Sequence, residues 1–122
     1  MTISAKRASL ATTIDAKLPA TYRVRPYKPS TAKALEGWLE INQTDLEETT
    51  YGEVRLSVTL VIPIASSRQQ FEKTQDEITV PIISAVRAAG GRAPVVTVVA
   101  DSVGNSTLYC LSCTFLTESE AG

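Results

Sequence analysis

Residues 52–64 read G-E-V-R-L-S-V-T-L-V-I-P-I, and apolar side chains occupy every second position from Val54 to Ile62. A period of two gives an extended strand one apolar face and one more polar face. The stretch is too short for a membrane-spanning helix, which needs about 20 consecutive apolar residues. It therefore predicts the central strand of a sheet, and the rest of the chain can be assigned by what pairs with this strand or covers it.

The composition is that of an ordinary globular protein. The chain has 122 residues, of which 43% are hydrophobic and 20% are charged, and its formal net charge is −1. This length predicts a single domain over residues 1–122, and the charge balance provides no general basic field for nucleic acid. The N-terminus lacks the apolar run of a signal peptide, so we expect a chain that stays in the cytoplasm where it is made.

Two segments have helical periodicity. In residues 4–17, Leu10 and Ile14 fall on one stripe with Leu18, and a proline follows at position 19. The second helix is predicted to begin at Ser66 or Ser67 and to end at Gly90-Gly91, with Phe71, Ile78, Ile82, Ala85 and Ala89 on its apolar stripe. Because Pro81 lies inside this second segment, we expect a kink or a break near Val80.

Four further segments favour strands. Residues 22–25 form a short edge segment, and residues 34–41 form a strand with Trp38 as its largest buried group and a possible bulge at Gly37. Residues 94–100 and 107–116 flank a turn-like sequence and are expected to pair antiparallel. The predicted fold class is α+β, with a mostly antiparallel or mixed sheet of about five strands and two helices packed on one face.

The stretch 42–52 is polar and acidic and joins two predicted strands. We interpret it as a long β-hairpin whose tip carries Asp45, Glu47 and Glu48, with Glu53 at the hairpin base. A solvated loop is the ordinary explanation for such acids. A functional role would require that these acids face a partner or an enclosed channel.

The last predicted strand is apolar on both faces. Leu108, Cys110 and Leu116 point to one side, while Tyr109, Leu111, Cys113 and Phe115 point to the other. Such a strand needs cover on both sides, from helices on one and from another subunit on the second. A small basic and aromatic patch, typical of a subunit interface or a solvated edge, or of a nucleic-acid contact, contains Arg23, Arg25 and Lys28 with Tyr22 and Tyr27. The candidate interface residues are Arg23, Arg25, Tyr27, Tyr109 and Phe115.

The sequence offers little catalytic chemistry. It contains no histidine, which is the commonest general base and metal ligand. Cys110 and Cys113 have the spacing of a redox or zinc motif, but residues three apart on a strand point to opposite faces, so we expect two separate core fillers. No catalytic residue, cofactor or metal site is predicted.

The order of elements and several stretches resemble the tail terminator proteins of long-tailed bacteriophages, also called minor tail or head–tail connector proteins. The stretches are A-K-L-P at 16–19, V-R-P-Y-K-P at 24–29, V-R-L-S-V-T-L-V-I-P at 54–63, the helical segment at 68–91 and Y-C-L-S-C-T-F at 109–115. The resemblance covers nearly the whole chain and rests on the order of the elements and on the residue patterns within them. Pro81 within the helix is a departure from the family's pattern.

The resemblance implies a structural protein without catalysis that forms a hexameric ring. Such a ring would cap the phage tail tube, stop its polymerisation and join it to a head-side connector or neck protein, with genomic DNA only passing through the lumen. In such a ring the candidates to line the lumen, where carboxylates would repel phosphates, or to contact the tube are Asp45, Glu47, Glu48 and Glu53. The protein would be assembled in the bacterial host cytoplasm and end in the virion, with no membrane contact. Two alternatives stay open: a neck or head-completion protein of the same virion, and a small intracellular enzyme or redox protein that uses Cys110 and Cys113.

Overall fold

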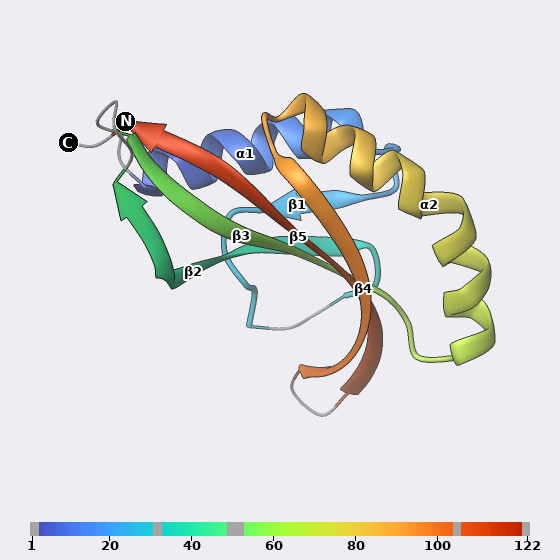
Figure 1. The fold of residues 1–122 in the computed structure, drawn as a ribbon. Helices are drawn as coiled ribbons and strands as arrows, with labels where there is room; N and C mark the ends of the chain where they lie inside the picture. Colours follow the sequence, from blue (N-terminus) through green and yellow to red (C-terminus); the bar gives the residue numbers. More distant parts are fainter. Residues whose placement is uncertain (1–2, 31–32, 49–52, 104–105, 121–122) are drawn as a thin grey trace.

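The computed structural model describes residues 3–30, 33–48, 53–103 and 106–120, and it describes the backbone alone at positions 3, 42–48, 53–55, 99–103, 106–107 and 118–120. Two helices and five strands follow one another along the chain (Figure 1). They are α1 (Ile3–Lys17), β1 (Arg23–Arg25), β2 (Glu36–Glu48), β3 (Glu53–Ala65), α2 (Arg68–Ala88), β4 (Arg92–Val103) and β5 (Ser106–Glu120).

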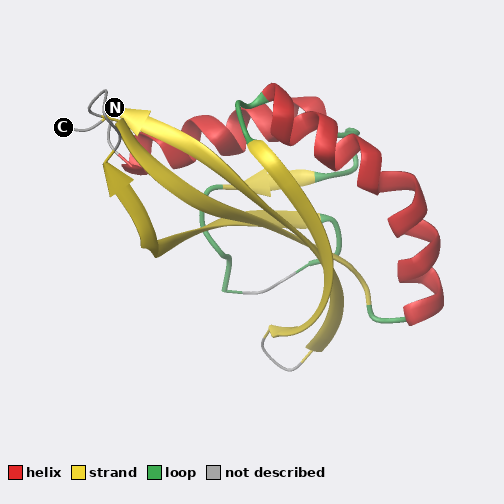
Figure 2. Cartoon of the chain, in the orientation of Figure 1, coloured by secondary structure: helices red, strands yellow, loops and turns green. Residues whose placement is uncertain are grey.

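The five strands form one mixed sheet with the order β1-β2-β3-β5-β4. β1 pairs parallel with β2, whereas the β2–β3, β3–β5 and β4–β5 pairs are antiparallel. Figure 2 shows the sheet as one twisted layer with both helices on the same side of it. The predicted fold class is therefore confirmed, and the alternating stretch around Val58 forms the middle strand.

The alternation in β3 matches its burial. Leu56, Val58 and Leu60 are each 0% exposed and belong to the core between sheet and helices. Both helices reach this core through their apolar stripes, as the spacing predicted. The buried helical residues are Leu10, Ala11 and Ile14 on α1 and Phe71, Ile78, Ile82, Ala85 and Val86 on α2.

Both ends of α2 follow from local sequence. The Ser67 hydroxyl accepts a hydrogen bond from the Gln70 backbone N–H (3.5 Å), and Gly90 adopts a φ of 88° just beyond the helix. Pro81 lies inside α2, where we expected a kink or a break, and the helix runs without interruption, so the break is wrong. Figure 1 shows that α2 changes direction part-way along its length, which is the kink that an interior proline is expected to cause.

Gly37 is explained by close packing and not by a bulge. It pairs regularly with Val24, and the next residue, Trp38, pairs regularly with Val61. A Cβ atom at Gly37 would lie 2.7 Å from the Val61 carbonyl oxygen and 2.8 Å from Ile62 Cγ1. The irregularity between β2 and β3 falls further along, between Asn42 and Glu47, so the prediction of a bulge at Gly37 is wrong.

A second, smaller cluster lies on the sheet face away from the helices. It contains Trp38, Val61 and Cys110, with Leu108 packed against it. The Lys28 Nζ lies 5.4 Å from the centre of the Trp38 ring, and the Trp38 Nε1–H donates a hydrogen bond to Glu40 Oε1 (3.0 Å). Residues 26–30, which follow β1, lie below the sheet in Figure 1, on the side away from the helices. Part of this second face is therefore covered within the chain itself.

Candidate assembly surface

The two edges of the sheet differ in how their backbone groups are satisfied. β1 has only three residues, and its two arginines are exposed. The Arg23 N–H donates to the Leu35 carbonyl oxygen (2.9 Å), whereas the next amide, Val24 N–H, donates to Asp15 Oδ1 of α1 (2.8 Å). A short, charged edge capped by a side chain resists the addition of another strand. The β1 edge is thus closed by the chain.

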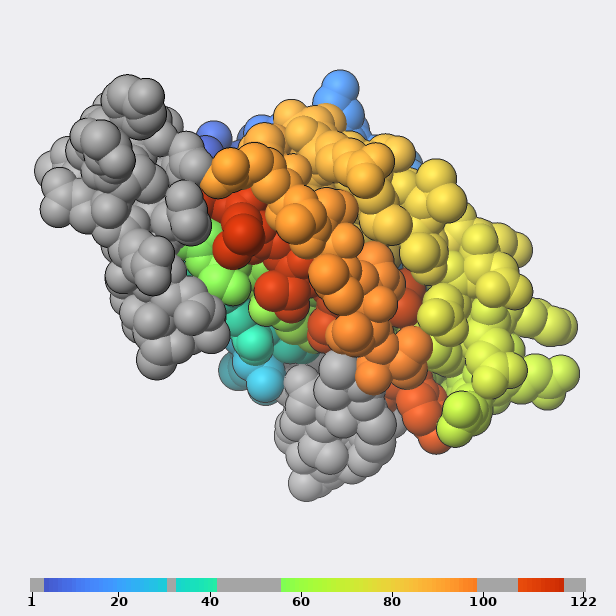
Figure 3. Space-filling model, in the orientation of Figure 1, coloured from blue at the N-terminus to red at the C-terminus, as the bar shows by residue number. Residues whose placement is uncertain are grey.

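The opposite edge, β4, is open. β4 has 12 residues and pairs with β5 alone. Its first residues are irregular, because the register shifts between Arg92 and Val95 and Ala93 has a φ of 50°. Beyond them, Val95 is 58% exposed and Val98 is 50% exposed. In the space-filling view the described β4 side chains (orange) lie at the surface with nothing over them (Figure 3). Such an edge is a natural site for contact with another chain.

A surface rich in hydroxyl side chains adjoins this edge on the sheet face away from the helices. We call it the hydroxyl face. The Thr59 and Thr114 hydroxyl oxygens lie 3.2 Å apart on adjacent strands, and Leu116 beside them is 37% exposed. The residues that make up the hydroxyl face are Thr59, Thr97, Thr114, Val95 and Leu116, with Ser57 and Ser112 nearly buried between them. A surface of small hydroxyl and branched apolar side chains can pack against a partner, and the exposed Glu40 borders this one beside Thr59.

Three predicted interface residues lie near the β1 edge. Arg23 and Arg25 are exposed, and the Arg25 Nη2 lies 3.8 Å from Glu36 Oε1 in an ion pair. Tyr27 is 54% exposed, and the Arg7 guanidinium lies 4.5 Å from the centre of its ring. These residues are accessible for a contact, at the opposite end of the strand order from β4.

The other two predicted interface residues lie on the helix-covered face of β5. Phe115 is 1% exposed and belongs to the main core, so its assignment to an interface is wrong. The alternation did place it on one face with Tyr109, but that face is the one the helices cover. Tyr109 is half-buried against Phe71, with 5.8 Å between ring centres, and lines a shallow hollow of about 170 Å³ beside Val98. The surface that β5 leaves open lies on its other side, at Leu116.

The acidic candidates lie on strands and not in a loop. β2 continues to Glu48 and β3 begins at Glu53, so Asp45, Glu47 and Glu48 belong to β2. Glu47 pairs in register with Arg55, and Glu48 pairs with Val54. Glu53 lies at the 49–52 end of the hairpin and not at its base, opposite Glu120 of β5. The tip itself, 49–52, and the side chains of these four residues lie outside the described part, so their role as a lumen or tube contact stays a prediction.

The two cysteines are separated by the sheet. Cys113 belongs to the main core under the helices and Cys110 to the cluster with Trp38 on the other face, as the spacing predicted. Both thiols are free and buried. Burial raises the pKa of Cys113 from 9.0 to about 11, so this thiol is a poor nucleophile at neutral pH. This geometry opposes a redox pair or a shared zinc site at these positions.

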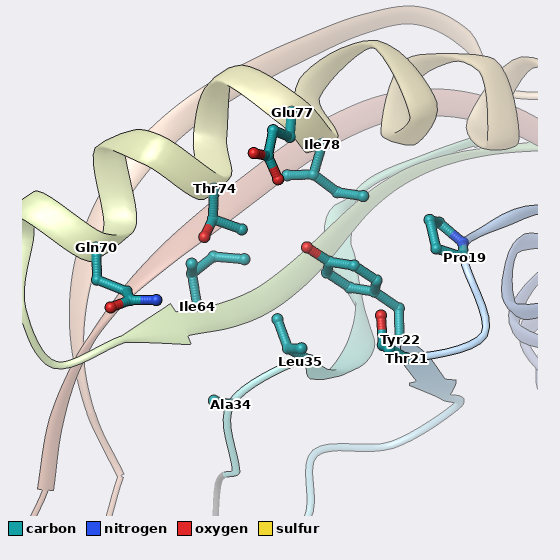
Figure 4. A pocket seen from close by; sticks show the side chains of 10 residues that line it. All are labelled: Pro19, Thr21, Tyr22, Ala34, Leu35, Ile64, Gln70, Thr74, Glu77 and Ile78. Carbon is teal, nitrogen blue, oxygen red and sulfur yellow. The ribbon is translucent and has the colours of Figure 1, made fainter.

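A hollow of about 400 Å³ lies between β1, the end of β3 and the first half of α2 (Figure 4). Tyr22 lies at its base and is 8% exposed, so it is not part of the exposed basic patch that the sequence suggested. Its hydroxyl is turned toward α2, where Thr74 and Glu77 line the same hollow. Burial, and secondly the negative charge of Glu77, raise the pKa of Tyr22, so the phenol stays protonated at neutral pH.

The sequence analysis predicted neither the open edge at β4 nor the hollow at Tyr22. The β-branched run in β4 was recognised as a strand, but the sequence does not reveal which strand lacks a second neighbour. Tyr22 and Glu77 are 55 residues apart along the chain, and only the tertiary structure brings them together.

Neither a family model nor a curated protein matches the chain. The functional proposal below therefore rests on the sequence and the structure. Within the described ranges, no helix has the length and apolar character needed to cross a membrane. The described side chains also include no cluster of three or more His, Cys, Asp or Glu residues suited to a metal ion.

Proposed function

We propose that this chain is a structural protein of a bacteriophage tail, a terminator that assembles into a hexameric ring. The observation that carries the proposal is the contrast between the two edges of the sheet: β1 is capped by Asp15, whereas β4 exposes Val95 and Val98. An open β-edge that adjoins a face of hydroxyl and apolar side chains is suited to association with another chain. The α+β fold with both helices on one face agrees with what the family resemblance implies.

A closed ring requires two different surfaces on every copy, because each subunit meets one neighbour on each side. In our proposal the β4 edge and the hydroxyl face form one of these surfaces. Arg23, Arg25 and Tyr27, at the other end of the strand order, are the candidates for the second. Tyr109 borders the first surface through its hollow beside Val98.

In this proposal the ring assembles in the bacterial host cytoplasm and becomes part of the virion at the head–tail junction. One ring face stops the tail tube protein from adding further subunits, and the other meets the head-side connector or neck protein. Genomic DNA contacts the ring only while it passes through the lumen. Asp45, Glu47, Glu48 and Glu53 are the candidates for the lumen or for the tube contact.

The assembly surface is tested by a double substitution, Val95→Lys with Val98→Lys. Charged side chains on an edge strand block pairing with another chain, so we expect a folded protein that no longer forms rings. The matched control is Val80→Lys, which makes the same change at a valine that is 70% exposed on α2. Sedimentation velocity and negative-stain microscopy, with and without tail tubes, report ring formation. Rings that persist in the double variant would exclude this surface.

The biological role is tested in the phage that encodes the chain. Removal of a terminator yields tails of uncontrolled length, whereas removal of a neck or head-completion protein yields tails of normal length beside unjoined or leaking heads. Electron microscopy of the defective lysate separates these outcomes. Normal tails with unjoined heads would contradict the terminator assignment and favour the neck protein.

A further inference from the structure

The hollow at Tyr22 combines apolar walls with a few polar groups. Leu35, Ile64 and Ile78 contribute aliphatic surface, and Pro19 closes one end. The polar atoms come from three sources: the Tyr22 hydroxyl, the Thr21 hydroxyl, and the side chains of Gln70, Thr74 and Glu77 on successive turns of α2. Apolar walls with a small number of converging polar groups are typical of a binding site.

The Tyr22 hydroxyl is available to a ligand. The residue is 8% exposed, and its oxygen points into the hollow toward Thr74 and Glu77 (Figure 4). Among the described residues, none forms a hydrogen bond with this hydroxyl. Because no buried side-chain oxygen or nitrogen of the described residues lacks a partner, this oxygen is accessible from the hollow, where a bound group can form a hydrogen bond with it.

The charged group that lines the hollow favours a positively charged ligand. Glu77 is the one charged residue among those that line it. A carboxylate beside a tyrosine ring repels phosphates and carboxylates and attracts a cation, which the face of the ring also favours. The aliphatic walls would remain exposed around a small hydrated ion, whereas they would pack against the alkyl part of an organic cation.

The shape of the surface favours a polypeptide over a free amine. A second hollow of about 360 Å³ adjoins the first, and Ala34, Ile64 and Gln70 line both. Its other walls include Leu108 and Ser67, near the start of α2. Because the two hollows share these walls, we treat them as one groove, in which residues next to a bound side chain would also find contacts.

We propose that this groove binds a segment of a partner protein and that a lysine of the partner enters the Tyr22 hollow. The lysine stem packs on Leu35, Ile64 and Ile78, and its ammonium group donates hydrogen bonds to Glu77 and to the Tyr22 oxygen. Neither hollow is lined by a β4 residue whose side chain the structure describes, Val95 and Val98 included, so this contact is separate from the assembly surface and does not depend on the ring proposal.

The test uses the folded ¹⁵N-labelled protein and two probes in an NMR titration. The probes are Nα-acetyl-lysine methylamide and its Nε-acetylated form, which keeps the stem but loses the charge. We expect the charged probe to shift the amide signals of Leu35, Thr74 and Glu77, with weaker shifts from the neutral probe. Equal binding of the two probes, or no shift at these residues, would overturn the proposal.

Variants separate the site from a general charge effect. Glu77→Gln should weaken binding of the charged probe about two- to fivefold, the range for an exposed ion pair. Tyr22→Phe should also weaken binding while the fold is kept, because the ring that packs in the core is unchanged. Asp76→Asn removes the same charge one residue away, outside the hollow, and should bind as the unmodified protein does. An equal loss in Asp76→Asn and Glu77→Gln would contradict the proposed site.

Discussion

At the scale of single residues, β5 places neighbouring side chains in two different environments. Cys113 is 1% exposed beneath the helices, whereas Cys110 is 0% exposed beside Trp38. Neither thiol has water around it, and the thiolate of Cys113 would be an uncompensated charge in an apolar cluster. The raised pKa of Cys113 makes stability depend on pH in the alkaline range.

The free energy of unfolding should fall as the pH rises from about 9 to about 11. In the folded protein the pKa of the Cys113 thiol is about 11, against 9.0 for an unperturbed thiol. The stabilisation that comes from this difference is therefore complete below pH 9 and is lost as the pH rises through about 11. Two pKa units correspond to about 3 kcal/mol. Urea denaturation at pH 8, 9, 10 and 11 measures the loss.

Cys113→Ala is the control for this pH dependence. The variant lacks the titrating thiol, so its stability should decline less over the same range, and the difference from the unmodified protein isolates Cys113 from Tyr22, whose pKa is also raised. Parallel pH curves for the two proteins would refute the assignment.

The residue pattern predicted which side chains share a face but not which face is covered. The alternation in β3 correctly predicted Leu56, Val58 and Leu60 as core residues. The same reasoning grouped Tyr109 with Phe115 on β5, yet their exposure depends on where the helices lie. That position is set by tertiary packing, which a period of two does not encode.

At the scale of elements, α1 and β1 support each other through one side chain. Asp15 is near the end of α1 and accepts the hydrogen bond of Val24 N–H, the amide that points away from β2. A charged acceptor on a backbone N–H forms a strong bond. This contact satisfies an edge amide that would otherwise be free to pair with another chain.

Substitution of Asp15 by alanine should destabilise the protein by about 1.5–3 kcal/mol, the value for a hydrogen bond to a charged group. Hydrogen exchange should accelerate at the Val24 amide in particular. Asp76→Ala, an exposed acid on α2, serves as the control and should leave both quantities nearly unchanged. If the Val24 amide keeps its protection without Asp15, the edge is closed by something else.

The sequence predicted the order of the helices and strands better than it predicted their lengths. Helical and strand periods placed both helices and all five strands in the correct order. The acidic stretch at 42–48 looked like a loop because its composition is polar, but pairing with β3 draws it into β2. Pro81 looked like a helix breaker, although packing of Ile78 and Ile82 on the sheet holds α2 together on both sides of it. In each case a long-range contact outweighed a local preference.

At the scale of the whole molecule, the two helices and the sheet share one core. Side chains from α1, α2, β2, β3 and β5 meet in it, and the cluster around Trp38 lies directly across the same strands. Layers that share strands are expected to unfold together. The prediction of a single domain can therefore be tested by whether the two clusters unfold in one step.

Thermal or urea unfolding should therefore give the same midpoint by two probes. Far-UV circular dichroism reports the helices, and fluorescence of Trp38, the only tryptophan, reports the opposite face of the sheet. We expect coincident transitions from a single cooperative step. A tryptophan signal that changes before the helical signal would show that the two faces unfold separately.

The strand order also constrains how the sheet is completed during synthesis on the ribosome. β5 is made after β4 but takes its place between β3 and β4. Until β5 emerges, β3 has a free edge along its whole length and β4 has no strand to pair with. Such unpaired strands in a nascent chain are exposed to off-pathway pairing with other chains, so protection of the growing polypeptide matters most just before β5 appears.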